Sequence, residues 1–128
     1  MLNSISHITL LVDDQDIALD FYKKLGFSVH TDANFGDMRW LTLHAPNQKN
    51  VELALLQAED EEEEALVGNQ AASKPFITLD VSDCKAACKK WKSEGIEIFE
   101  EPKQEPWGIS AAIVDPFGNL IYVCQPTQ

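Results

Sequence analysis

Apolar and polar residues alternate along several short stretches of this chain, and two longer stretches carry apolar residues at helical spacing. Residues 4–12 alternate and run into Asp13 and Asp14, which predicts a strand followed by a helix cap. A helix is predicted over residues 15–25, where apolar residues recur at i, i+3, i+4 and i+7: Ala18, Phe21, Tyr22 and Leu25. Gly26 is expected to end this helix in a left-handed cap.

The same order of elements is written a second time. HITLLVDD at residues 7–14 is echoed by FITLDVSD at residues 76–83. A second helix is predicted after Asp83 and before Gly95, with an apolar face formed by Cys84, Ala87, Cys88 and Trp91. Each helix is followed by a short strand (27–29 and 96–98), a longer strand (38–46 and 108–116) and a last strand, with a turn at Gly118 and Asn119. Repetition of this kind predicts two βαβββ modules.

The two modules are expected to form one domain over residues 1–128, because a chain of this length has room for one proper core. Module one spans about residues 4–56 and module two about residues 75–125. Between them, about residues 57–74 are interpreted as an acidic linker with one short helical turn. The run EDEEEE at residues 59–64 is interpreted as solvated surface.

Charge and composition narrow the classes of partner. The formal net charge is −11, and the Lys and Arg patches that nucleic acid requires are absent, so no nucleic-acid partner is expected and cationic ligands are favoured over anionic ones. No signal peptide and no membrane-length apolar stretch occur, which predicts a cytoplasmic protein that does not bind membranes. Cys84, Cys88 and Cys124 are expected to be reduced and buried.

Strand alternation assigns side chains to the two faces of each sheet. Ile8, Leu10 and Val12 are expected to pack under the first helix, which turns His7 to the other face. The same parity places a mixed polar and aromatic set on that other face: His7, Trp40, His44 and Glu52 in module one, and Phe76, Asp80 and Tyr122 in module two. A face of this composition is expected to line a small-molecule cleft.

The segments HITLLVDD (7–14), FYKKLGF (21–27), VELALL (51–56) and DPFGNLIYVCQ (115–125) together resemble the vicinal oxygen chelate superfamily. That superfamily includes glyoxalase I, bleomycin resistance proteins, fosfomycin resistance enzymes, methylmalonyl-CoA epimerase and extradiol dioxygenases. The resemblance covers nearly the whole chain. It implies an α+β fold in which two βαβββ modules form a cupped mixed sheet with helices on the outer face, and it implies a homodimer.

The resemblance also implies where a metal would be bound. Metal enzymes of the superfamily draw ligands from the positions of His7, Glu52, Phe76 and Tyr122, and here the last two are aromatic. A catalytic divalent ion typically needs three protein ligands, and a phenyl ring has no lone pair to offer. We therefore expect no metal or other cofactor. The minority alternative is an atypical divalent metal site completed by His44 or by a dimer mate.

A binding protein is the first functional hypothesis. Trp40, Phe76, Trp107 and Tyr122 would give the cleft aromatic walls that stack on planar groups or hold cations. Bleomycin resistance proteins, which the chain resembles, sequester a drug in such grooves without altering it. The predicted ligand-binding residues are His7, Trp40, His44, Glu52, Phe76, Trp107 and Tyr122.

Two alternatives stay open. His7 and Glu52 are expected to lie within a few ångströms of each other, and such a pair could act as acid and base in a glyoxalase-like lyase or isomerase. The third hypothesis is an interaction module that uses the acidic run at residues 59–64 as its contact.

Overall fold

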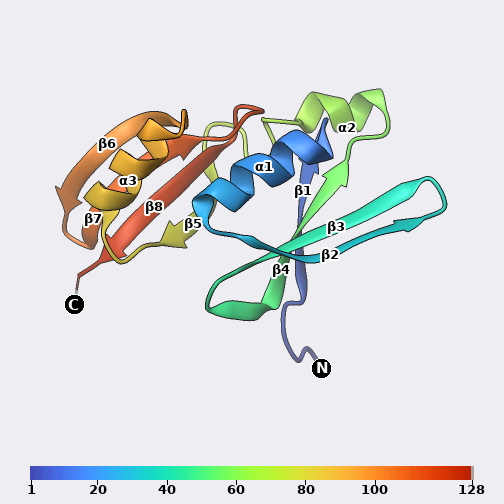
Figure 1. The fold of residues 1–128 in the computed structure, drawn as a ribbon, viewed down its shortest axis with the longest axis horizontal. Coiled ribbons are helices and arrows are strands. Elements are labelled where there is room, and N and C mark those ends of the chain that lie inside the picture. Colours follow the sequence, from blue (N-terminus) through green and yellow to red (C-terminus); the bar gives the residue numbers. More distant parts are fainter. Residues whose placement is uncertain (128) are drawn as a thin grey trace. The chain divides into compact units, whose positions relative to one another are not determined.

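The computed structural model describes residues 1–127 and divides the chain into two compact units. The first unit runs from Met1 to Val67, and the second begins at Gly68. Both units contain a four-stranded sheet with a helix after the first strand (Figure 1). The βαβββ order predicted for each half is therefore confirmed.

The first unit builds its sheet in the order β1-β4-β3-β2, with β1 and β4 parallel and the other neighbours antiparallel. Its elements are β1 (His7–Val12), α1 (Gln15–Leu25), β2 (Ser28–Phe35), β3 (Met38–Ala45), β4 (Gln48–Gln57) and α2 (Glu61–Leu66). Parallel pairing of the two ends of the module puts β1 beside β4, the strand that carries Glu52.

The second unit repeats this topology with the order β5-β8-β7-β6, and here β5 and β8 are the parallel pair. Its elements are β5 (Pro75–Asp80), α3 (Cys84–Ser93), β6 (Glu97–Glu105), β7 (Gly108–Val114) and β8 (Leu120–Pro126). Neither sheet closes into a barrel.

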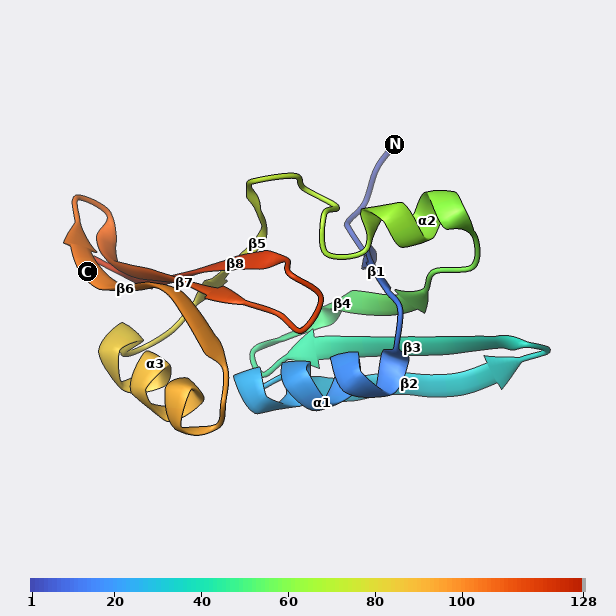
Figure 2. The ribbon, with the colours of Figure 1, turned by 90° about the horizontal axis from the view of Figure 1, so that it is seen from above.

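Helix α1 begins and ends at the residues that the sequence indicates. The Asp14 carboxylate accepts a hydrogen bond of 3.0 Å from the Ile17 N–H, and Gly26 adopts a φ of 119° after the last turn. Ala18, Phe21 and Tyr22 are buried. In Figure 2, α1 runs alongside the strands of its own sheet and α3 lies against the second sheet, where Asp83 caps it in the same way.

A buried glutamine fixes the start of α1 on its sheet. The side-chain amide of Gln15 donates hydrogen bonds of 3.0 Å to the Arg39 carbonyl on β3 and 2.8 Å to the Leu55 carbonyl on β4. Buried polar groups need such partners, so Gln15 ties the helix to two strands at once. The sequence alone did not indicate that this polar residue is buried.

Two strands extend beyond the sequence prediction. β2 continues to Phe35 and β6 to Glu105, because both pair with the following strand in a hairpin that is interrupted by bulges. The acidic segment forms the six-residue helix α2, whose N-cap Asp60 accepts a hydrogen bond of 2.8 Å from the Glu63 N–H.

Ile8 was expected to pack under α1, but it is 43% exposed at the start of an edge strand, whereas Leu10 and Val12 are fully buried.

The turn between β7 and β8 is organised by one buried carboxylate. Asp115 is 4% exposed, and its Oδ1 accepts hydrogen bonds from the Phe117 N–H at 2.9 Å and the Asn119 N–H at 2.8 Å. Its Oδ2 accepts a third bond, of 2.8 Å, from the Asn119 side-chain amide. Gly118 has a φ of 103°, as the predicted turn requires.

Candidate functional site

A carboxylate with two imidazole neighbours lies on the first sheet. Register pairs His7 of β1 directly with Glu52 of β4, and the His7 Nε2 lies 3.4 Å from the Glu52 Oε1. The Nδ1 of His30, on β2, lies closer to the same oxygen, at 3.0 Å. The proximity of His7 and Glu52 agrees with the sequence prediction, but the second imidazole was not predicted.

Thr42 completes the surroundings of this carboxylate. Its fully buried hydroxyl donates a hydrogen bond of 2.7 Å to the Glu52 Oε1. This bond, followed by the charges of His30 and His7, lowers the pKa of Glu52 below its ordinary value, although partial burial opposes the shift. Glu52 is therefore ionised at neutral pH. We refer to Glu52, His7, His30 and Thr42 as the Glu52 cluster.

The cluster is accessible to solvent. The Glu52 side chain is 14% exposed, whereas those of His7 and His30 are 36% and 44% exposed. The carboxylate is thus less exposed than either imidazole. A partly buried negative charge attracts a cation more strongly than a charge in bulk water, because fewer water molecules screen it.

Trp40 lies beside His7 of the Glu52 cluster. Its ring lies 5.5 Å from that of His7, with an angle of 59° between the planes, and the side chain is half-buried on β3. An indole face next to an ionised carboxylate offers both stacking and electrostatic attraction to a flat cation. The structure therefore brings together His7, Trp40 and Glu52 of the predicted set.

His44 lies near the Glu52 cluster but forms no ion pair with Glu52. Its ring lies 6.1 Å from that of His30, and its Nδ1 is 3.0 Å from the carbonyl of the next residue, Ala45. Among residues 1–127, His7 and His30 form ion-pair contacts with Glu52, and His44 does not. His30 rather than His44 is the second imidazole of the cluster.

A bulge explains why strand alternation does not predict the position of His30. The pairing of β2 with β3 shifts between Val29 and Thr31, so His30 is the extra residue of the bulged strand. Bulges re-aim side chains and break the alternation on which parity arguments rest. In the sequence, the only indication of this position is a histidine directly after a predicted short strand.

The donors in the described part of the chain do not fit the metal site of the superfamily. Phe76 has no donor atom, and no group of three or more His, Cys, Asp or Glu side chains there is arranged to hold a metal ion. Within the Glu52 cluster, both imidazoles and the Thr42 hydroxyl approach the same oxygen of Glu52. We derive no chemistry through a metal from this arrangement.

The second unit has a different polar group on its sheet. The Trp107 indole N–H donates to the Ser110 hydroxyl at 3.0 Å and to the Tyr122 hydroxyl at 3.1 Å. A cavity of about 390 Å³ adjoins it, lined by Glu100, Glu101, Lys103, Glu105, Ser110 and Tyr122. Three carboxylates and one ammonium group give this cavity a negative balance.

Phe76 and Tyr122 do not repeat the direct pairing of His7 with Glu52. The register of β5 on β8 shifts between Pro75 and Ile77, so Phe76 is an extra residue and Tyr122 pairs with Thr78. Phe76 is half-buried. The two modules thus share a topology but differ at the positions where the superfamily binds metal.

Comparisons with known proteins agree with the fold. Residues 4–123 match the model of the Glyoxalase/Bleomycin resistance protein/Dioxygenase superfamily. An uncharacterized protein of Shewanella frigidimarina is 34% identical over 94% of this chain and 91% of its own length. The crystal structure of UcmS2 is similar with a TM-score of 0.85, at 29% identity over 97% of this chain and 98% of UcmS2.

A further solved structure has a described activity. TnmS3, an antibiotic binding protein from Streptomyces sp. CB03234, is 26% identical and covers 98% of both chains with a TM-score of 0.79. In the described residues of the present chain, no helix is long and apolar enough to cross a membrane.

Proposed function

Because this chain belongs to the Glyoxalase/Bleomycin resistance protein/Dioxygenase superfamily, we propose that it binds a planar organic cation and sequesters it without chemical change. The observation that carries the proposal is the Glu52 cluster. An ionised carboxylate contacts two imidazoles that are more exposed than it is, and the Trp40 ring lies beside one of them, His7. The antibiotic binding protein TnmS3, which has the same fold, supports a binding function for this protein.

The charge of Glu52 favours binding over acid–base catalysis. A general base works best when its pKa lies near the working pH. The Thr42 hydrogen bond moves the pKa of Glu52 in the opposite direction, away from neutrality. A carboxylate that stays ionised is a weak proton acceptor but a persistent partner for a cation, so the lyase or isomerase hypothesis ranks second.

The proposed binding uses no resident metal. Three contacts within the Glu52 cluster converge on Oε1, so Oε2 is the oxygen that we expect an incoming ammonium or ring N–H to meet. Such a charge-assisted hydrogen bond contributes about 1.5 to 3 kcal/mol when water is excluded.

The second unit offers further groups for binding, but the proposal does not depend on them. Tyr122 and Trp107, held together by their hydrogen bond, would contact aromatic groups, and Phe76 would do so by its half-buried ring. The acidic cavity beside Tyr122 also favours cations.

We further propose that the protein is a homodimer, for which light scattering should give about twice the chain mass of 14.3 kDa.

A matched series of three-ring compounds tests the proposed ligand class. Proflavine is cationic, acridone is neutral and acridine-9-carboxylate is anionic, while their planar areas are similar. We expect proflavine to bind at least tenfold more tightly than acridone, and acridine-9-carboxylate to bind most weakly, because Glu52 favours positive charge. Quenching of tryptophan fluorescence measures each dissociation constant. Equal or tighter binding of the anion would refute the proposed ligand class.

A further inference from the structure

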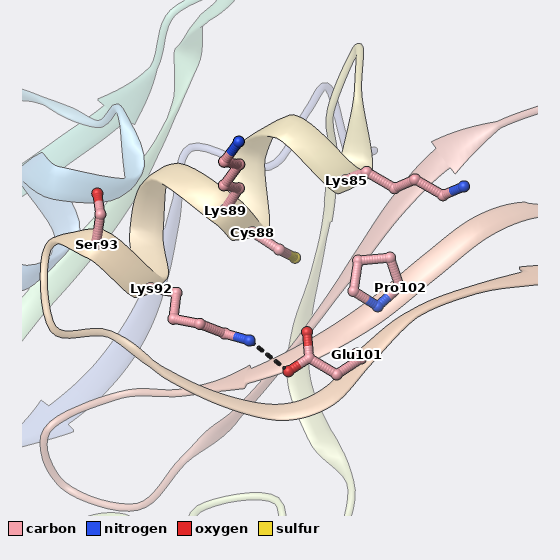
Figure 3. Close-up of a pocket in the computed structure, with 7 residues that line it drawn as sticks. All are labelled: Lys85, Cys88, Lys89, Lys92, Ser93, Glu101 and Pro102. Atoms are coloured by element: carbon pink, nitrogen blue, oxygen red, sulfur yellow. Dashed lines mark hydrogen bonds and ion pairs between the residues drawn. The ribbon is translucent and has the colours of Figure 1, made fainter.

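A groove of about 590 Å³ lies between α3 and β6, within the second unit, and shares Glu101 with the cavity beside Tyr122 (Figure 3). We call it the α3–β6 groove. The residues of its wall that matter here are Lys85, Cys88, Lys89 and Lys92 of α3 and Glu101 and Pro102 of β6. Its volume lies within the range of about 300 to 1,000 Å³ that is usual for small-molecule sites.

The groove is the basic part of an acidic protein. Four of the ten Lys and Arg residues of the chain lie on the ten-residue helix α3, and three of them line the groove. Its acidic wall residue, Glu101, is already paired with Lys92 at 2.7 Å. Lys85 and Lys89 form no ion pair with the described residues, which leaves the groove with two uncompensated positive charges.

The floor of the groove is neutral. Cys88 is 2% exposed, and burial raises the pKa of its thiol to about 12, so that it carries no negative charge at neutral pH. Pro102 opposite has no N–H to offer. In Figure 3, Cys88 and Lys92 point toward β6, Lys85 extends on the Pro102 side, and Lys89 points away from β6. The groove therefore combines a thiol and a proline ring with ammonium groups at its edges.

The lysine pattern weakens the helix that carries it. Lys85 lies in the first turn of α3, where the helix dipole disfavours a positive charge, and that turn contains no acidic residue. Lys85 and Lys89 are also four positions apart, and like charges at this spacing are destabilising. A bound anion would offset both unfavourable terms.

We propose that the α3–β6 groove binds a small organic anion with an apolar body, of the size of a medium-chain carboxylate. Lys85 and Lys89, whose side chains leave α3 one turn apart, turn toward the anionic head on binding, and the body lies over Cys88 and Pro102. This site takes the opposite charge from the Glu52 cluster, and its residues belong to a different unit. Either proposal can therefore fail while the other stands.

Octanoate is the probe for this proposal, with octylamine and 1-octanol as controls of equal chain length. We expect isothermal titration calorimetry to show octanoate binding at least tenfold more tightly than either control, with affinity that falls as salt is added. The amide resonance of Cys88 should shift during the titration. Equal binding of octanoate and 1-octanol, or resonance shifts confined to the first unit, would overturn the proposal.

A double variant separates the site from the overall charge. Lys85→Gln with Lys89→Gln should raise the dissociation constant of octanoate at least tenfold. The control, Lys23→Gln with Lys24→Gln on α1, changes the net charge equally and should leave that constant within about twofold. All four lysines are exposed, so both double variants are expected to fold, which thermal melting checks. Equal loss in the two double variants would contradict the assignment.

Discussion

Glu52→Gln is expected to weaken proflavine binding by a factor of about ten to one hundred, because it removes the charge that the ligand meets, together with the ion-pair contacts to His7 and His30. Glutamine keeps the shape of the side chain, and its carbonyl oxygen can still accept the hydrogen bond from the buried Thr42 hydroxyl. The loss of affinity would then report electrostatics rather than a change of fold. Fluorescence titration of both proteins measures it.

A surface glutamate provides the matched control. Glu61→Gln on α2 changes the net charge by the same amount at an exposed position in the first unit. We expect its proflavine affinity to stay within about twofold of the original protein, because screened surface charges act weakly at a distance. If both variants lose affinity equally, proflavine is attracted by the overall acidity of the protein and the Glu52 cluster is not its site.

The pH dependence of stability gives the Glu52 variant a second readout. The folded-state pKa of Glu52 is lowered, so its contribution to stability is fully present above the ordinary carboxyl pKa and is lost as pH falls through the folded pKa. The stability difference between the original protein and Glu52→Gln should be present above the ordinary carboxyl pKa and should be lost as the pH falls through the folded pKa of Glu52. A difference that persisted undiminished well below the ordinary carboxyl pKa would contradict a lowered pKa of Glu52.

Asp115→Ala is expected to lower the free energy of unfolding by about 3 kcal/mol or more, because three donors would lose their acceptor in a buried turn. Two of these donors are backbone N–H groups, and the third is the amide of Asn119, which is 4% exposed. Water cannot easily replace the carboxylate at such a position. Urea denaturation measures the change.

Two further variants make this prediction specific. Asp37→Ala, at the exposed turn between β2 and β3, should cost less than about 0.5 kcal/mol. Asp115→Asn should place two amide groups against each other, and adding Asn119→Asp should restore much of the loss by exchanging donor and acceptor. If Asp115→Ala proves no worse than Asp37→Ala, the turn is not held by this carboxylate.

Local sequence rules were sufficient for the fold. The caps at Asp14 and Asp83 and the buried faces of α1 and α3 follow from helical spacing and capping chemistry. The internal repeat predicted the order of strands, and register then placed His7 opposite Glu52. These features depend on neighbours in sequence or on one long-range pairing, so a pattern in the sequence contains them.

The finer features of the site depended on irregularities that alternation does not reveal. A bulge in β2 brings His30 to Glu52, and a register shift in β5 moves Phe76 away from direct pairing with Tyr122. The hydrogen bond from Thr42 required the tertiary structure, because a threonine in a strand has many equally good partners. The lysines of α3 looked like ordinary surface until the structure showed the groove beside them.

Titration of chelator-treated protein with proflavine, before and after addition of one equivalent of zinc, tests the central claim most directly. The donors in the described residues include no group of three arranged for a metal, and Glu52 is ionised beside two imidazoles. The account predicts that the metal-free protein binds proflavine, that zinc leaves the affinity unchanged or weakens it by competing for Glu52, and that chelation does not lower the melting temperature. Binding that appears only after zinc is added, together with a melting temperature that falls on chelation, would contradict it.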